Sequence, residues 1–171
     1  MLDIMKRILR TGMLSEALPG SEEHRVHVGT IHERLHDVFG RALRIRHVDA
    51  GSCNGCELEI QALGNPYYNL EGAGIAFVAS PRHADVLMVT GPVSVNMEEA
   101  LKQAYEVMPE PKWVIAVGDC GVCGGIFGTS YASRGAVANV IPVDATVPGC
   151  PPTPLALLQG LLLVTSSPRQ S

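Results

Sequence analysis

The sequence predicts a doubly wound α/β fold, in which helices cover both faces of a parallel sheet. Short, nearly continuous apolar runs recur from residue 44 onward, as in strands that are buried on both faces. Segments with the apolar spacing of helices separate these runs. A chain of 171 residues suits a single core, so one such domain accounts for the length.

Each strand and helix is predicted from its local pattern. The five expected strands are residues 45–49, 74–79, 85–90, 112–117 and 137–143. The expected helices are residues 57–63, 95–108 and 154–163. In the second of these helices the side chains at helical spacing should face inward, and they are Met97, Leu101, Ala104, Tyr105 and Met108.

The N-terminal part differs from the rest of the chain. We expect residues 1–28 to form an amphipathic arm and polar linker, residues 29–165 an α/β iron–sulfur domain, and residues 166–171 a flexible tail. Residues 1–14 have an apolar face at helical spacing, and residues 30–43 have another. The arm either folds onto this domain or docks on a neighbouring subunit or a membrane interface.

Composition narrows the function classes. Only 18% of residues are charged, the net charge is −4, and there is no basic field of the kind that nucleic-acid binding needs, so no nucleic-acid partner is expected. The N-terminus lacks the apolar run of a signal peptide, which predicts a cytoplasmic protein. The apolar stretch 155–164 is far shorter than the ~20 residues that a membrane-spanning helix needs.

Cysteines provide the strongest functional signal. All five lie at junctions between predicted strands and helices, as Cys53, Cys56, Cys120, Cys123 and Cys150. The loops after the carboxyl ends of parallel strands meet at one edge of a sheet, where ligands bind in such folds. Thiolates are soft ligands that select iron–sulfur clusters, zinc or Cu(I). The sequence therefore predicts a convergent thiolate site.

Three kinds of thiolate site compete. A structural zinc takes four cysteines, but it usually organises a domain that lacks a core, and this domain has ample apolar sheet. A thioredoxin-like pair would leave Cys150 unexplained. Glycines flank every cysteine motif and leave room for backbone to approach bulky sulfides, and Cys150 is followed by proline, as in ferredoxin-type motifs. These features favour an iron–sulfur cluster.

Four ordered motifs carry a family resemblance. They are GSCNGCELEI (51–60), SPRHADVLMVTGP (80–92), GDCGVCGG (118–125) and PGCPP (148–152). Together they resemble the small-subunit family of [NiFe] hydrogenases and its complex I relatives, in register over residues 44–163. The resemblance implies a flavodoxin-like fold with the cysteine-bearing loops at the carboxyl edge of the sheet. It also implies one [4Fe–4S] cluster, bound by Cys53, Cys56, Cys120 and Cys150.

The branch of the family follows from the spacing of the first motif. Two residues separate Cys53 from Cys56, as in hydrogenases, whereas the complex I subunit has adjacent cysteines. The chain lacks the twin-arginine signal and the C-terminal cluster-binding extension of periplasmic hydrogenases. It is therefore similar to the small subunit of membrane-bound, complex-I-like hydrogenases of the formate hydrogenlyase or energy-converting type, related to the complex I 20 kDa subunit.

This branch implies an electron-transfer subunit without a catalytic residue of its own. Its expected partners are a [NiFe]-type large subunit, a ferredoxin-like iron–sulfur subunit and membrane-embedded subunits, on the cytoplasmic side of the cell membrane. The alternatives are a quinone- or coenzyme F420-linked complex-I-type oxidoreductase, a relative whose large partner has lost nickel, and a zinc-stabilised interaction module.

Other polar residues have simpler interpretations. Cys123 does not match a ligand position, so we expect a buried or partner-covered free thiol. Glu57 and Glu59 suit the first turn of a helix. Arg82 and His83 should lie in solvent at a strand entry, on the edge opposite the cysteines. His32 and His36 are spaced like a metal-binding pair but lack a third ligand, and we expect them on a surface.

Overall fold

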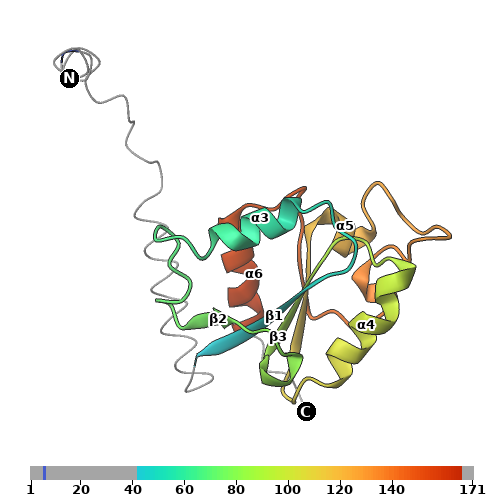
Figure 1. Ribbon diagram of the computed structural model, residues 1–171, viewed down its shortest axis with the longest axis horizontal. Coiled ribbons are helices and arrows are strands. Elements are labelled where there is room, and N and C mark those ends of the chain that lie inside the picture. Colours follow the sequence, from blue (N-terminus) through green and yellow to red (C-terminus); the bar gives the residue numbers. More distant parts are fainter. Residues whose placement is uncertain (1–5, 7–41, 167–171) are drawn as a thin grey trace.

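The computed structural model describes residue 6 and residues 42–166, and a parallel sheet runs through its centre (Figure 1). In this described part the sheet has five strands in the order β2–β1–β3–β4–β5, with every neighbouring pair parallel. The strands are β1 (Leu43–Asp49), β2 (Ile75–Phe77), β3 (Val86–Thr90), β4 (Trp113–Val117) and β5 (Ala145–Val147). The predicted α/β fold with a parallel sheet is confirmed.

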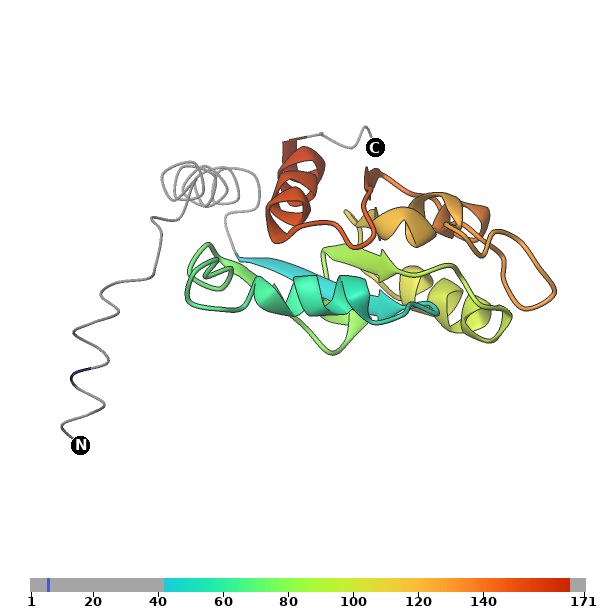
Figure 2. The same cartoon turned by 90° about the horizontal axis from the view of Figure 1, so that it is seen from above.

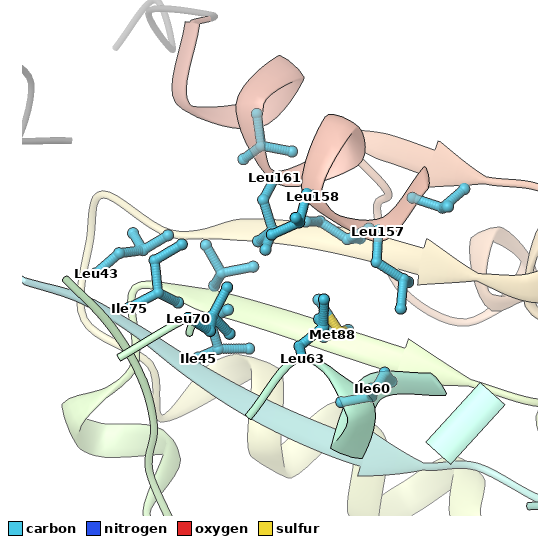
Figure 3. Packing of buried hydrophobic residues seen from close by; sticks show 14 of the residues in the cluster. Leu43, Ile45, Ile60, Leu63, Leu70, Ile75, Met88, Leu157, Leu158 and Leu161 are labelled. Carbon is cyan, nitrogen blue, oxygen red and sulfur yellow. The ribbon is translucent and has the colours of Figure 1, made fainter. Parts of the chain in front are cut away.

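Helices pack on both faces of the sheet (Figure 2). The helical elements are α3 (Gly55–Ala62), η1 (Pro81–His83), α4 (Val95–Glu106), α5 (Gly118–Cys123), η2 (Val137–Asn139) and α6 (Pro154–Ser166). One apolar cluster lies between the sheet and helices α3 and α6, and Figure 3 shows its side chains. The other lies on the opposite face, beneath α4 and η2.

Alternation along the strands fills both clusters. In β3, Val86 and Met88 belong to the cluster beneath α3 and α6, whereas Leu87 and Val89 belong to the cluster beneath α4. Successive side chains of a strand point to opposite faces, so a strand with apolar residues at every position must be covered on both sides. Leu101 in α4 is buried, and so is Met108, which lies two residues beyond the end of this helix.

The predicted fifth strand at residues 137–143 is wrong. Its first residues form η2, where Val137 and Ile141 are spaced as in a helix turn and are buried against the sheet. Pro142 has no N–H to donate to a strand ladder. The strand that pairs with β4 begins only at Ala145. Directly before it, the Asp144 carboxylate accepts a hydrogen bond of 2.7 Å from the N–H of Val114.

A similar pair of hydrogen bonds lies directly before β3. The Asp85 N–H donates to the carbonyl of Arg44 at 2.8 Å, and the Asp85 carboxylate accepts a hydrogen bond of 2.9 Å from the N–H of Arg44. Asp85 is buried and Arg44 is exposed, so this bond is partly shielded from water. An aspartate thus joins β1 to β3, and a second joins β4 to β5.

The N-terminal predictions lie almost entirely outside the described residues. Lys6 is helical and exposed, as expected for the polar face of a helix over residues 1–14. The linker, the second amphipathic segment, the boundary at residue 28 and the predicted tail at 166–171 are not tested. Within the part of the chain that the structure describes, no helix is both long and apolar enough to cross a membrane.

Replacing Asp85 by Ala should lower the free energy of unfolding by about 1–3 kcal/mol, because the N–H of Arg44 loses its acceptor in a partly buried place. Urea unfolding of the full chain, followed by the fluorescence of its single tryptophan, Trp113 in β4, measures this change. Asp85→Asn keeps an acceptor oxygen and should cost less. An Ala variant as stable as the wild type would contradict the role given to this carboxylate.

Candidate metal centre

The strands that lead to the cysteines end in one row across the sheet. The last residues of β1, β3, β4 and β5 are register neighbours, and they are Asp49, Thr90, Val117 and Val147. Cysteine-bearing segments follow three of these ends, so the predicted edge is the observed one. In Figure 1, α3 and α5 lie at this same end of the sheet.

Four cysteines come together at this edge. Cys53 lies in the loop after β1, Cys56 in the first turn of α3, Cys120 in α5 and Cys150 after β5. Burial, as the largest cause, and the charges of Glu57, Cys53, Cys120 and Cys150, in that order, together raise the pKa of Cys56 to about 11. Burial also raises the pKa of Cys120, with Cys150 and Cys53 as the largest charge contributions. Segments far apart in the sequence therefore form one thiol cluster.

Glycines occupy positions where a side chain would strike a thiol. A Cβ on Gly118 would lie 2.6 Å from Sγ of Cys56, and one on Gly125 would lie 2.8 Å from Sγ of Cys120. Both glycines also have positive φ, of +77° and +53°, which other residues adopt at a cost. The site is thus built so that backbone, rather than side chains, lines the space beside the sulfurs.

Backbone hydrogen bonds tie the cysteine loops to each other. The Asp119 carboxylate accepts a hydrogen bond of 2.7 Å from the N–H of Gly149, while the Asp119 N–H donates to the carbonyl of Gly149 at 2.9 Å. The Asp49 carboxylate accepts two more, from Gly51 and Ser52, and shapes the loop before Cys53. These two aspartates fix the loops from which the thiols project.

The residues present fit an iron–sulfur cluster. They supply four soft sulfur donors from one edge of the sheet, with glycine backbone beside two of them. Among the described residues, no group of three or more His, Cys, Asp or Glu side chains is placed to hold a single metal ion. Which of the thiols bind iron remains a prediction.

Cys123 departs from its expected environment. It ends α5 and is exposed in this chain, so the prediction of a thiol buried within the domain is wrong. Its Sγ donates to the carbonyl of Asp119 at 3.1 Å, one helical turn earlier. No residue that the structure describes covers this thiol, and cover by a partner subunit stays a prediction.

Glu57 is more than an acidic residue at a helix start. The residue is only 7% exposed, and the hydroxyl of Thr90, at the end of β3, donates a hydrogen bond to its Oε1. Nε2 of His47 lies 3.0 Å from the Thr90 hydroxyl oxygen and 3.7 Å from the same Oε1. Because the one hydroxyl proton of Thr90 points to Glu57, the nitrogen of His47 is the donor to Thr90.

Sequence reasoning did not single out His47 or Thr90. The available signal was Thr90, the polar residue that ends the otherwise apolar β3, whereas His47 lies among the other polar residues of β1 and does not stand out. Burial lowers the pKa of His47, although the neighbouring charges of Glu57 and Asp49 oppose this. His47 therefore joins Glu57 and Thr90 as a neutral imidazole.

Arg82 and His83 lie away from this edge. They are exposed in η1, at the amino end of β3, as expected. Glu59 is partly exposed on α3. The pair His32 and His36 lies outside the described residues.

An exposed apolar segment adjoins the thiol cluster. After α5 the chain projects, and Ile126 is 94% exposed, Phe127 58% and Tyr131 98%. Residues 121–133 contain no charged side chain. Leu58, two positions after Cys56 on α3, is also 58% exposed. Several exposed, large apolar side chains in an uncharged segment are typical of a protein interface.

Comparisons with known proteins agree with the fold and the motifs. Residues 53–164 match the family described as NADH ubiquinone oxidoreductase, 20 kDa subunit. The probable membrane-bound hydrogenase subunit mbhJ of Pyrococcus furiosus is 48% identical over 125 residues, which are 73% of this chain and 75% of that protein. Formate hydrogenlyase subunit 7 of Escherichia coli is 45% identical over 123 residues, which are 72% of this chain but only 48% of that protein.

A solved structure is also similar. A chain in the structure of the membrane-bound sulfane sulfur reductase, an archaeal respiratory membrane complex, has a TM-score of 0.64 and 33% sequence identity. The match covers 73% of this chain and 69% of the other. The family match includes every cysteine of the thiol cluster and most of the sheet. This chain belongs to the family of the 20 kDa subunit of NADH ubiquinone oxidoreductase, whose members named here are subunits of oxidoreductase complexes.

Proposed function

We propose that this chain is the electron-transfer subunit of a membrane-bound, complex-I-like [NiFe] hydrogenase complex. In this role Cys53, Cys56, Cys120 and Cys150 hold one [4Fe–4S] cluster. The observation that supports the proposal most is the meeting of four thiols beyond the ends of three strands, beside glycines that keep side chains out. The 48% identity to a hydrogenase subunit favours this branch of the family.

The bound cluster would supply one-electron chemistry, which cysteine thiols alone do not provide. The residues of this chain hold and surround it. The two aspartates of the loops position the cysteines, and the raised pKa of Cys56 means that a proton must leave this thiol before it can bind iron. We assign no catalytic residue to this chain, because the interconversion of H₂ and protons belongs to a nickel-bearing large subunit.

The exposed segment around Ile126 and Tyr131 is the surface that we assign to this large subunit. It adjoins α5, which carries Cys120, so a partner seated there would lie close to the cluster. An uncharged, apolar surface suits a permanent subunit contact better than a transient encounter. A ferredoxin-like iron–sulfur subunit and membrane-embedded subunits complete the proposed complex, with this chain peripheral on the cytoplasmic side of the cell membrane.

One second function has a specific observation in its favour. The solved structure with a TM-score of 0.64 comes from a sulfane sulfur reductase complex, so the same fold serves a complex named for another substrate. In that case the large partner would lack nickel. The metal content of the purified complex separates the two functions.

Replacing any one of Cys53, Cys56, Cys120 or Cys150 by Ala should abolish the cluster or change its type. Iron content and EPR spectra of the anaerobically prepared chain measure this. Cys123→Ala is the matched control, and it should keep the iron and the signal. Loss of the cluster in Cys123→Ala together with an intact cluster in Cys120→Ala would overturn the ligand set.

Cluster loading should become faster with rising pH. The pKa of Cys56 is raised to about 11, so between about pH 7 and about pH 9 its thiolate fraction grows by about tenfold per pH unit. Anaerobic reconstitution of the iron-free chain with iron and sulfide, followed by visible absorption, measures the initial rate. Cys123→Ser should show the same dependence on pH. A rate that does not change over this range would show that deprotonation of Cys56 does not limit loading.

The native complex, purified through a tag on this chain, should contain nickel as well as iron. Ile126→Asp and Tyr131→Asp should each remove the nickel-bearing subunit from the purified material, because a charge is placed in an apolar contact, while the chain keeps its own iron. Leu163→Asp, at a 64% exposed apolar residue on α6, is the control and should leave the complex intact. A wild-type complex with iron and no nickel would favour the second function.

A further inference from the structure

A buried carboxylate with one unpaired oxygen lies directly after a proposed cluster ligand. Glu57 follows Cys56 in α3 and is only 7% exposed. Its Oε1 is held by Thr90, while its Oε2 is buried and accepts no hydrogen bond from any residue that the structure describes. A buried polar atom without a partner costs free energy, and the few that native structures keep call for an explanation.

Fold stability does not explain this carboxylate. The hydroxyl of Thr90 needs one acceptor, and the neutral side-chain oxygen of a glutamine would serve. A charged carboxylate with one unpaired oxygen costs more free energy in an apolar surrounding than a neutral amide does. Such departures from local rules are typical of functional sites.

Three elements fix the carboxylate in place. Thr90 of β3 is completely buried, and His47 of β1 approaches both Thr90 and Glu57. The side chains of Thr90 and His47 have few rotatable bonds, and each projects from a strand of the sheet. The carboxylate of Glu57 on α3 is therefore held in one position. It is also shielded from solvent ions, so salt screens it weakly.

We propose that Glu57, held by Thr90 and His47, is a positioning residue whose fixed negative charge keeps the reduction potential of the cluster low. This inference rests on the proposed function, in which Cys56 is a ligand of that cluster. Reduction adds one electron, and therefore negative charge, next to a buried anion, so the oxidised form is favoured. The electron passes between the ferredoxin-like iron–sulfur subunit and the large subunit by way of the cluster, and no proton or bond changes at Glu57.

The test compares Glu57→Gln with the wild type in the full chain, reconstituted anaerobically so that it holds a single cluster. Glutamine keeps the shape and an acceptor for Thr90 but removes the charge. We expect its reduction equilibrium to shift by about tenfold toward the reduced form, which is about 59 mV for one electron. An EPR-monitored redox titration measures this. Glu59→Gln, two residues along the same helix, is the control and should leave the potential unchanged, and Glu57→Asp should stay closer to the wild type than Glu57→Gln does.

Separate outcomes identify which idea is wrong. A Glu57→Gln chain with full iron content and the wild-type potential would overturn this inference alone. Failure of the wild-type chain to bind iron would overturn the proposed function, and this inference with it. Should Glu57→Gln not take up iron, reduced-minus-oxidised infrared spectra of the Glu59→Gln chain, with ¹³C-labelled glutamate, give the answer. A glutamate carboxylate band that shifts on reduction supports the inference, and the absence of such a band overturns it.

Discussion

Parallel register is the constraint on which the site depends. Because β1, β3, β4 and β5 end in one row, the loops after them begin at the same height on the sheet. Cys120 and Cys150 each lie three residues beyond the row, and Cys53 lies four beyond it. A slip of one residue in any strand would move its cysteine and also turn its apolar side chains to the wrong face. The packing that stabilises the sheet therefore also sets the positions of the thiols.

Two opposing demands meet at this edge. Thiols that are to become thiolates are better placed near cations, yet Cys56 and Cys120 are partly buried and have carboxylates beside them. The surroundings therefore favour protonated thiols, and the free energy of binding the proposed cluster would have to overcome this. Asp119, one of these carboxylates, and Asp49 accept hydrogen bonds from backbone N–H groups of the loops, so order at the edge does not depend on metal alone.

Sequence patterns were sufficient where the signal was local. Continuous apolar runs located β1, β3 and β4 within a few residues, and helical spacing located α4. They failed for β5. Residues 137–143 have the apolar pattern of a strand, but the observed strand begins only after Asp144, whose hydrogen-bond partner Val114 is 30 residues away. The short α5 has too few turns to leave a periodic signal. The bonds of Thr90 to Glu57 and His47 join residues 33 and 43 positions apart, so no local pattern contains them.

The two outermost strands of the described sheet are its shortest. Both β2 and β5 have only three residues, so each edge offers few free backbone groups for pairing with another chain. This matters for a protein that also displays an apolar segment before its partners arrive. While the chain is unassembled, side chains can attract a partner, but the backbone gives little template for edge-to-edge aggregation. Pairing of backbones at the described sheet edges is thereby disfavoured relative to contacts made by exposed side chains.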